Sequence, residues 1–144
     1  MKVKRLEESE TMTYALVFET GDEVMAGLKE FAQEQHLDAS HFTAIGAFSD
    51  ATLGFFDIDL KQYRKNPVRE QVEVLSLVGD ISLDPQGQPQ VHAHVVLGCP
   101  DSTTRGGHLL RAHVRPTLEV MLVETPAALR REYDADAGLA LIRL

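Results

Sequence analysis

Residues 72–97, VEVLSLVGDISLDPQGQPQVHAHVVL, carry the clearest structural pattern in the chain, with two apolar runs on either side of a turn signal. The runs at residues 72–77 and 91–97 are rich in valine and leucine and have the length of β-strands. Between them, Asp84-Pro85-Gln86-Gly87 favours a reverse turn, because proline presets φ and glycine accepts a positive φ. The sequence therefore predicts two strands joined by a tight turn.

The segments on either side suggest a sheet with little helix. Residues 22–36 have apolar side chains at helical spacing, and Thr20 with Glu23 resembles a capping box. Residues 61–69 are basic and polar, and Asn66-Pro67 marks a turn. Further strands are predicted at residues 14–19, 42–47, 51–59, 117–124 and 139–144. Short links between many strands favour antiparallel pairing, so the predicted class is α+β, with a mainly antiparallel β-sheet flanked by helices.

Length and charge restrict the possible functions. The 144 residues suit one domain over 1–144, with a core over 14–144 and a flexible N-terminus over 1–10. A net charge of −8 argues against a sequence-independent grip on nucleic acid and against binding to an anionic membrane. The single cysteine, Cys99, has no intrachain partner, and neither a signal peptide nor a membrane-spanning run is seen. We expect a cytoplasmic protein.

The histidines at residues 92 and 94 are the first candidates for a functional site. Side chains two residues apart share one face of a strand, so His92 and His94 point the same way with backbones about 7 Å apart. Imidazole suits zinc or another divalent transition metal. His108, after Gly106-Gly107, is the third candidate, delivered from a glycine-containing loop. Three protein ligands would leave a fourth position for water or substrate.

Other interpretations of these residues stay open. Histidines in a His-X-His pair are also found solvated or held by ordinary hydrogen bonds. His113 is predicted on the opposite strand face from His108, and His36 suits a helix end. His41 has no motif around it. Cys99 is either a fourth, thiolate ligand or a small buried hydrophobic residue.

Several motifs resemble the plants and prokaryotes conserved (PPC) domain family, in its stand-alone prokaryotic form. Residues 72–79, VEVLSLVG, resemble its signature strand, and residues 92–98, HAHVVLG, resemble its His-X-His strand. Residues 106–109, GGHL, are similar to its glycine-histidine segment, and the strand after them is similar to the strand that follows that segment in the family. Residues 43–48 and 51–57 also resemble the prokaryotic members. The resemblance covers residues 14–144 in the family's order.

This resemblance implies an α/β sandwich-like fold, a homotrimer, and a metal bound by His92, His94 and His108. Family members are often labelled as DNA-binding. Plant members carry AT-hook segments that this chain lacks, and Glu70-Gln71 stands where they have Gly-Arg before the signature strand. These departures argue against direct DNA binding here.

Three functions follow as hypotheses. The first is a binding and assembly module with a metal and a small-molecule or protein partner. The second is a metal-dependent enzyme of hydrolytic or lyase type, with Glu73 and Glu119 as acid–base candidates unless they pair with Arg105 or Arg115. The third is nucleic-acid binding through a local basic patch, which a solvated loop explains equally well. The patch residues are Lys61, Arg64, Lys65 and Arg69.

Overall fold

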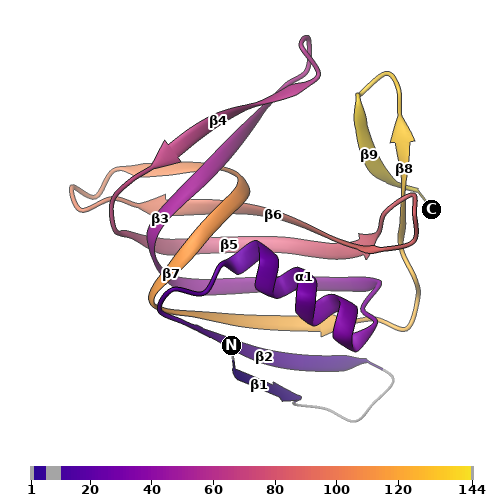
Figure 1. The fold of residues 1–144 in the computed structure, drawn as a ribbon, viewed down its shortest axis with the longest axis horizontal. Helices are drawn as coiled ribbons and strands as arrows, with labels where there is room; N and C mark the ends of the chain where they lie inside the picture. Colours follow the sequence, from indigo (N-terminus) through magenta and orange to yellow (C-terminus); the bar gives the residue numbers. More distant parts are fainter. Residues whose placement is uncertain (1, 6–10, 144) are drawn as a thin grey trace.

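The computed structural model describes residues 2–5 and 11–143, which form one helix and a nine-stranded sheet (Figure 1). The elements are β1 (Lys2–Arg5), β2 (Met12–Glu19), α1 (Val24–Gln35), β3 (Ala39–Asp57), β4 (Gln62–Val68), β5 (Val72–Leu83), β6 (Pro89–Gly98), β7 (Thr104–Glu124), β8 (Arg130–Asp134) and β9 (Leu139–Arg143). All strand pairs are antiparallel except a short parallel contact of β5 with β8. The predicted α+β class with a mainly antiparallel sheet is confirmed.

Two long strands hold the sheet together. β3 has 19 residues and β7 has 21, and they pair with each other along most of their length, from Ser40 opposite Glu124 to Gly54 opposite His108. β3 also pairs with β5, β5 with β6, and β6 with the first part of β7. This circuit closes on itself, so the sheet curves strongly (Figure 1). A bulge at Gly46 lets β3 bend, and a Cβ there would lie 2.7 Å from the Cα of Leu118.

The hydrophobic core lies between the concave sheet and helix α1. The helix buries Val24, Leu28, Phe31 and Ala32 in one cluster with inward side chains of the strands. Tyr14 of β2 meets Phe31 edge to face, with ring centroids 5.2 Å apart. Each buried leucine or phenylalanine of this kind contributes about 1.5–3 kcal/mol of burial free energy. No helix within residues 11–143 is long and apolar enough to cross a membrane.

The predicted capping box at the start of α1 is wrong. Glu23 itself is the N-cap, and its carboxylate accepts hydrogen bonds from the backbone N–H groups of Met25 and Ala26. The same carboxylate accepts from the N–H of Ala112 in β7, so the cap also anchors the helix to the sheet. The Thr20 hydroxyl instead donates to the carbonyl of Pro116. The predicted helix end holds, because His36 takes the left-handed C-cap conformation at φ 55°.

Several predicted boundaries also change. The two strands expected at residues 42–47 and 51–59 are one strand, β3, because its glycine lies at a bulge rather than a turn. Residues 62–68 form β4 instead of a loop, and Pro67 is tolerated because β4 pairs on one side only among the described strands. Of the N-terminal residues 1–10, predicted to be flexible, Lys2–Arg5 form β1, whereas residues 1 and 6–10 lie outside the described residues.

A buried carboxylate at the end of β7 supports the turn after α1. Glu124 accepts hydrogen bonds from the N–H groups of Asp38 and Ala39, at 3.0 and 3.1 Å, and from the Ser40 hydroxyl. We expect Glu124→Gln to lower the free energy of unfolding by about 1–3 kcal/mol. The NH₂ of the glutamine amide cannot accept a hydrogen bond, so one of the donors that now bind the carboxylate would lose its acceptor. Urea unfolding checks this, with the exposed Glu132→Gln as control. Equal stability of the two variants would contradict the assigned role.

Candidate metal centre

Sheet register brings three histidines together. His92 and His94 lie on β6, and His108 lies on β7 directly opposite His94. One ligand atom from each ring lies within 4.8 Å of the others. The three ring centroids are 5.0 to 5.4 Å apart. These residues are called the histidine cluster below. His108 was predicted on a loop, but it belongs to a strand, and pairing rather than loop flexibility positions it.

The spacing of the ring nitrogens fits a metal ion. The Nε2 atoms of His92 and His94 lie 3.2 Å apart. A tetrahedral ion with nitrogen ligands at about 2.0–2.1 Å holds two such atoms about 3.3–3.4 Å apart. Without an ion, one Nε2–H would donate to the other nitrogen, since two lone pairs at this distance repel. The donor set therefore fits zinc or a similar divalent transition metal.

The cluster favours neutral imidazole, which is the form that binds metal. Desolvation lowers the pKa of His108 to about 4, helped by the charges of His92, His94 and Arg131. Desolvation and the neighbouring His92 also lower the pKa of His94. Both rings consequently carry free lone pairs at neutral pH, and little proton release is needed when a metal binds.

A carboxylate orients His92. Asp80 lies opposite His92 in the β5–β6 pairing, and its Oδ2 is 3.2 Å from His92 Nδ1. With the proton on Nδ1, the Nε2 lone pair faces the cluster. The Arg131 guanidinium donates to Asp80 Oδ1 at 2.6 Å and to the Ser82 hydroxyl at 2.8 Å. Burial raises the pKa of Asp80, but the hydrogen bonds from His92 and Arg131 outweigh burial and leave it lowered.

Strand β4 supplies a wall of the cluster. The Tyr63 ring lies 4.8 Å from the His108 ring, centroid to centroid. Gly54 of β3 stands opposite His108, and a Cβ on it would lie 2.8 Å from Tyr63 Cδ1, so its missing side chain gives Tyr63 room. Desolvation raises the pKa of Tyr63, which keeps its hydroxyl protonated. His108 Nδ1 is buried and has no hydrogen-bond partner among the described residues.

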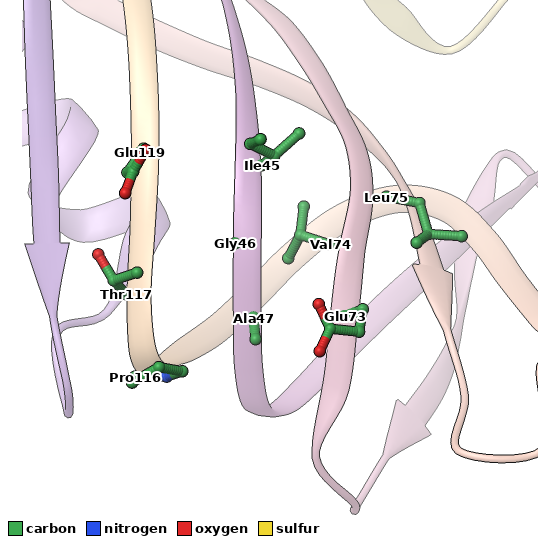
Figure 2. Close-up of a pocket in the computed structure, with 9 residues that line it drawn as sticks. All are labelled: Ile45, Gly46, Ala47, Glu73, Val74, Leu75, Pro116, Thr117 and Glu119. Atoms are coloured by element: carbon green, nitrogen blue, oxygen red, sulfur yellow. The ribbon is translucent and has the colours of Figure 1, made fainter.

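The two predicted acid–base candidates lie elsewhere. Glu73 and Glu119 line a pocket of about 500 Å³, on either side of the β3 segment that contains Ile45 (Figure 2). Val78, the residue opposite His94, is five positions after Glu73, or roughly 16 Å along the strand. Neither carboxylate makes an ion pair among the described residues, and Arg105 pairs with Glu70 instead.

The remaining candidates also lie outside the histidine cluster. His113 Nδ1 is 3.0 Å from Asp50, and its Nε2 is 3.2 Å from Arg111. His36 caps the helix. Cys99 is partly buried against the core and is not among the residues that could share a metal. Sequence reasoning did not identify Asp80, Arg131 or Tyr63 as parts of the site. Of these three, Asp80 alone had a signal in the sequence, its position across the predicted turn from His92.

Known structures share this fold over the whole chain. A PPC protein from Pyrococcus horikoshii is 28% identical, with a TM-score of 0.85 and coverage of 99% of this chain and 95% of that one. A metal-containing protein from Archaeoglobus fulgidus is 31% identical, with a TM-score of 0.85 and coverage of 99% and 97%. A candidate DNA-binding protein from Ralstonia eutropha JMP134 is also 31% identical, with a TM-score of 0.85 and coverage of 91% and 90%. No curated protein matches.

Sequence comparison agrees with these structural matches. The profile described as the Plants and Prokaryotes Conserved (PCC) domain, the family called PPC above, matches residues 5–126. That stretch contains the whole histidine cluster and Asp80. The chain belongs to the PCC domain family.

Proposed function

We propose that this protein is a metal-binding assembly module, in which His92, His94 and His108 hold one divalent transition metal ion, with zinc preferred. The observation that carries this proposal is the 3.2 Å separation between the Nε2 atoms of His92 and His94. Asp80 orients the His92 ring. The relative from Archaeoglobus fulgidus is a metal-containing protein, which supports the same reading. When bound, zinc would act as a Lewis acid and activate a water molecule in the remaining position.

The chain's own residues set the character of the site. Asp80 holds the proton of His92 on Nδ1, and Arg131, whose side chain is only 8% exposed, keeps Asp80 ionised and in place. Tyr63 shields one side of His108 from water. Zinc-bound imidazoles with a carboxylate behind them are typical of tuned metal sites. We further propose, from the family resemblance and from exposed apolar side chains on the sheet such as Ile45, Leu75 and Met121, that the module works as a cytoplasmic homotrimer.

A metal-dependent enzyme of hydrolytic or lyase type is the alternative function. Its support is the three-ligand set, which leaves one position open, and Tyr63, whose ring lies beside His108 and whose raised pKa keeps the hydroxyl protonated. Glu73 and Glu119 are not acid–base candidates for this enzyme, since they line a separate pocket that does not include the histidine cluster. Activity that depends on both zinc and Tyr63 would favour the enzyme over the module.

DNA binding has weaker physical support. The Ralstonia relative is a candidate DNA-binding protein, but this chain carries a net charge of −8. Its basic patch lies along β4 and its flanks, where Arg64 is already paired with Asp57. Phosphate binding needs a surplus of unpaired positive charge. We therefore leave DNA out of the proposed function.

Metal content per chain tests the proposal directly. Untagged wild-type protein, analysed by elemental mass spectrometry, should hold about one zinc ion per chain. The double variant His92→Ala/His94→Ala should hold none, because it keeps one ligand. His41→Ala, an exposed histidine outside the cluster, is the matched control and should bind metal like wild type. Wild-type protein that stays metal-free after incubation with zinc would refute the proposal.

A further inference from the structure

The C-terminal hairpin is attached to the rest of the molecule by few contacts. β8 and β9 pair with each other, but among the described residues β8 meets the main sheet in a single parallel pairing, Arg130 with Leu83 (Figure 1). Leu129 anchors the base through backbone hydrogen bonds with Leu83 and Asp38. No side chain of residues 130–143 belongs to the hydrophobic core. Because a two-stranded hairpin is marginally stable by itself, its position depends on a small number of polar contacts.

Arg131 fastens the hairpin to the sheet beside the histidine cluster. It is the one buried side chain of residues 130–143, and a buried arginine requires hydrogen-bonding partners. Its guanidinium donates to Asp80 Oδ1 at 2.6 Å and to the Ser82 hydroxyl at 2.8 Å, both on β5. It also donates to the carbonyl of Ala140 in β9, at 3.3 Å. One side chain thus joins both strands of the hairpin to β5.

A weaker contact holds the tip of the hairpin. The Lys61 ammonium, in the turn before β4, donates to the carbonyl of Ala135 at 2.6 Å. Both residues are exposed, and an exposed contact of this kind contributes little to stability. Arg131 makes its contacts while almost fully buried, where charge-assisted hydrogen bonds are stronger. Arg131 is therefore the contact that decides whether the hairpin is docked.

The same guanidinium reaches a metal ligand through one carboxylate. Asp80 Oδ1 accepts from Arg131, while Asp80 Oδ2 lies 3.2 Å from His92 Nδ1. If the hairpin undocked, Asp80 would lose this partner and could turn away from His92, which would free the imidazole to rotate and to change tautomer. The positive charge of Arg131 opposes a metal cation only weakly, because Asp80 neutralises it. The loss of orientation dominates, so a docked hairpin favours metal binding.

We propose that the hairpin β8–β9 is a strap whose docking is coupled to metal binding through Arg131, Asp80 and His92. The inference rests on the proposed metal site. A docked strap holds Asp80 behind His92 and raises the metal affinity, and a bound metal fixes His92 and Asp80 and so stabilises the docked strap. The coupling is reciprocal, so both effects share one factor. Arg131 is a positioning residue, because it acts on the metal through Asp80, and we expect a factor of about ten.

A second arginine of the same hairpin allows a matched test. Arg143 forms an exposed ion pair with Asp134, at 2.8 Å, within the hairpin. Arg131→Met removes the hydrogen bonds to β5 and keeps an unbranched chain, whereas Arg143→Met leaves Asp80 untouched. Competition with a chromophoric chelator should show zinc binding about tenfold weaker in Arg131→Met and unchanged in Arg143→Met. Circular dichroism checks that both variants are folded.

Hydrogen exchange of the wild-type protein tests the reverse effect without any substitution. The backbone N–H groups of residues 131–142 should exchange about tenfold more slowly with saturating zinc than with a chelator, since docking and binding share one factor. The last turn of α1 lies outside the histidine cluster and provides the comparison. Its N–H groups, which exchange by local fraying, should exchange at the same rate in both conditions.

The two measurements separate the coupling from the metal site itself. Wild type that binds zinc without slower exchange in the hairpin would overturn the coupling, even if Arg131→Met bound zinc weakly, because Arg131 would then act without any change in docking. Wild-type zinc affinity in Arg131→Met would overturn the role of Arg131. Wild type that binds no zinc at all would refute the proposed function, which is a different result from either of these.

Discussion

Replacing Asp80 with alanine is expected to weaken zinc binding by about 10- to 100-fold and to lower the free energy of unfolding by about 3–5 kcal/mol. The first effect arises because His92 loses the carboxylate that fixes its tautomer. The second arises because the Arg131 guanidinium, almost fully buried, loses its counter-ion. Competition with a chromophoric zinc chelator measures the affinity, and urea unfolding of the metal-free protein measures the stability.

The chain contains a matched control for this prediction. Asp50 makes the same carboxylate–imidazole contact with His113, at 3.0 Å, but it is 46% exposed and lies outside the cluster. We expect Asp50→Ala to leave zinc affinity unchanged and to cost about 1 kcal/mol or less. If Asp50→Ala and Asp80→Ala weakened zinc binding equally, Asp80 would have no specific role at the metal site.

Strand alternation explains why part of the site was predictable. His92 and His94 are two residues apart in a run with clear strand character, so their shared face follows from local geometry alone. The structure confirms this, with Nε2 atoms 3.2 Å apart. His108 was identified as a candidate, but its place opposite His94 depends on which strands pair, and periodicity does not specify a partner strand.

The residues that support the cluster depend on distant contacts. Asp80 follows a glycine and had the pattern of an interruption in a strand, yet it lies inside β5 and faces His92. Arg131 is 51 positions further along the chain, in a strand that was not predicted. Glu73 and Glu119 were chosen because their neighbours are apolar, but alternation places the neighbours inside and both carboxylates outside.

The start of the helix shows how a tertiary contact overrides a local pattern. Thr20 and Glu23 have capping-box spacing, but the N–H of Ala112 in β7 also needs an acceptor, and the Glu23 carboxylate serves it while capping the helix. With Glu23 in that position, the helix begins at Val24. Tertiary hydrogen bonds of this kind set the ends of strands and helices. For this reason the fold class could be predicted from the sequence, whereas the first and last residues of its elements could not.

The metal-free protein is expected to lose about 1–2 kcal/mol of stability between about pH 7 and 5 through the cluster, after allowance for partial solvent screening. The folded-state pKa of His108 is about 4, below the ordinary 6.5 of the unfolded chain. Between these values the unfolded chain binds a proton that the folded chain does not. The stabilisation is therefore complete above the unfolded pKa and is lost as the pH falls toward the folded one, and His94 adds to it in the same direction.

Urea unfolding in the presence of a chelator, at both pH values, measures this loss. His108→Gln should flatten the pH dependence, whereas His41→Gln, an exposed histidine outside the cluster, should leave it unchanged. Equal pH dependence in wild type and His108→Gln would show that the cluster is not desolvated in solution. Zinc should steepen the wild-type curve further, because protons and metal compete for the same nitrogens, so the metal's stabilisation also declines as the pH falls.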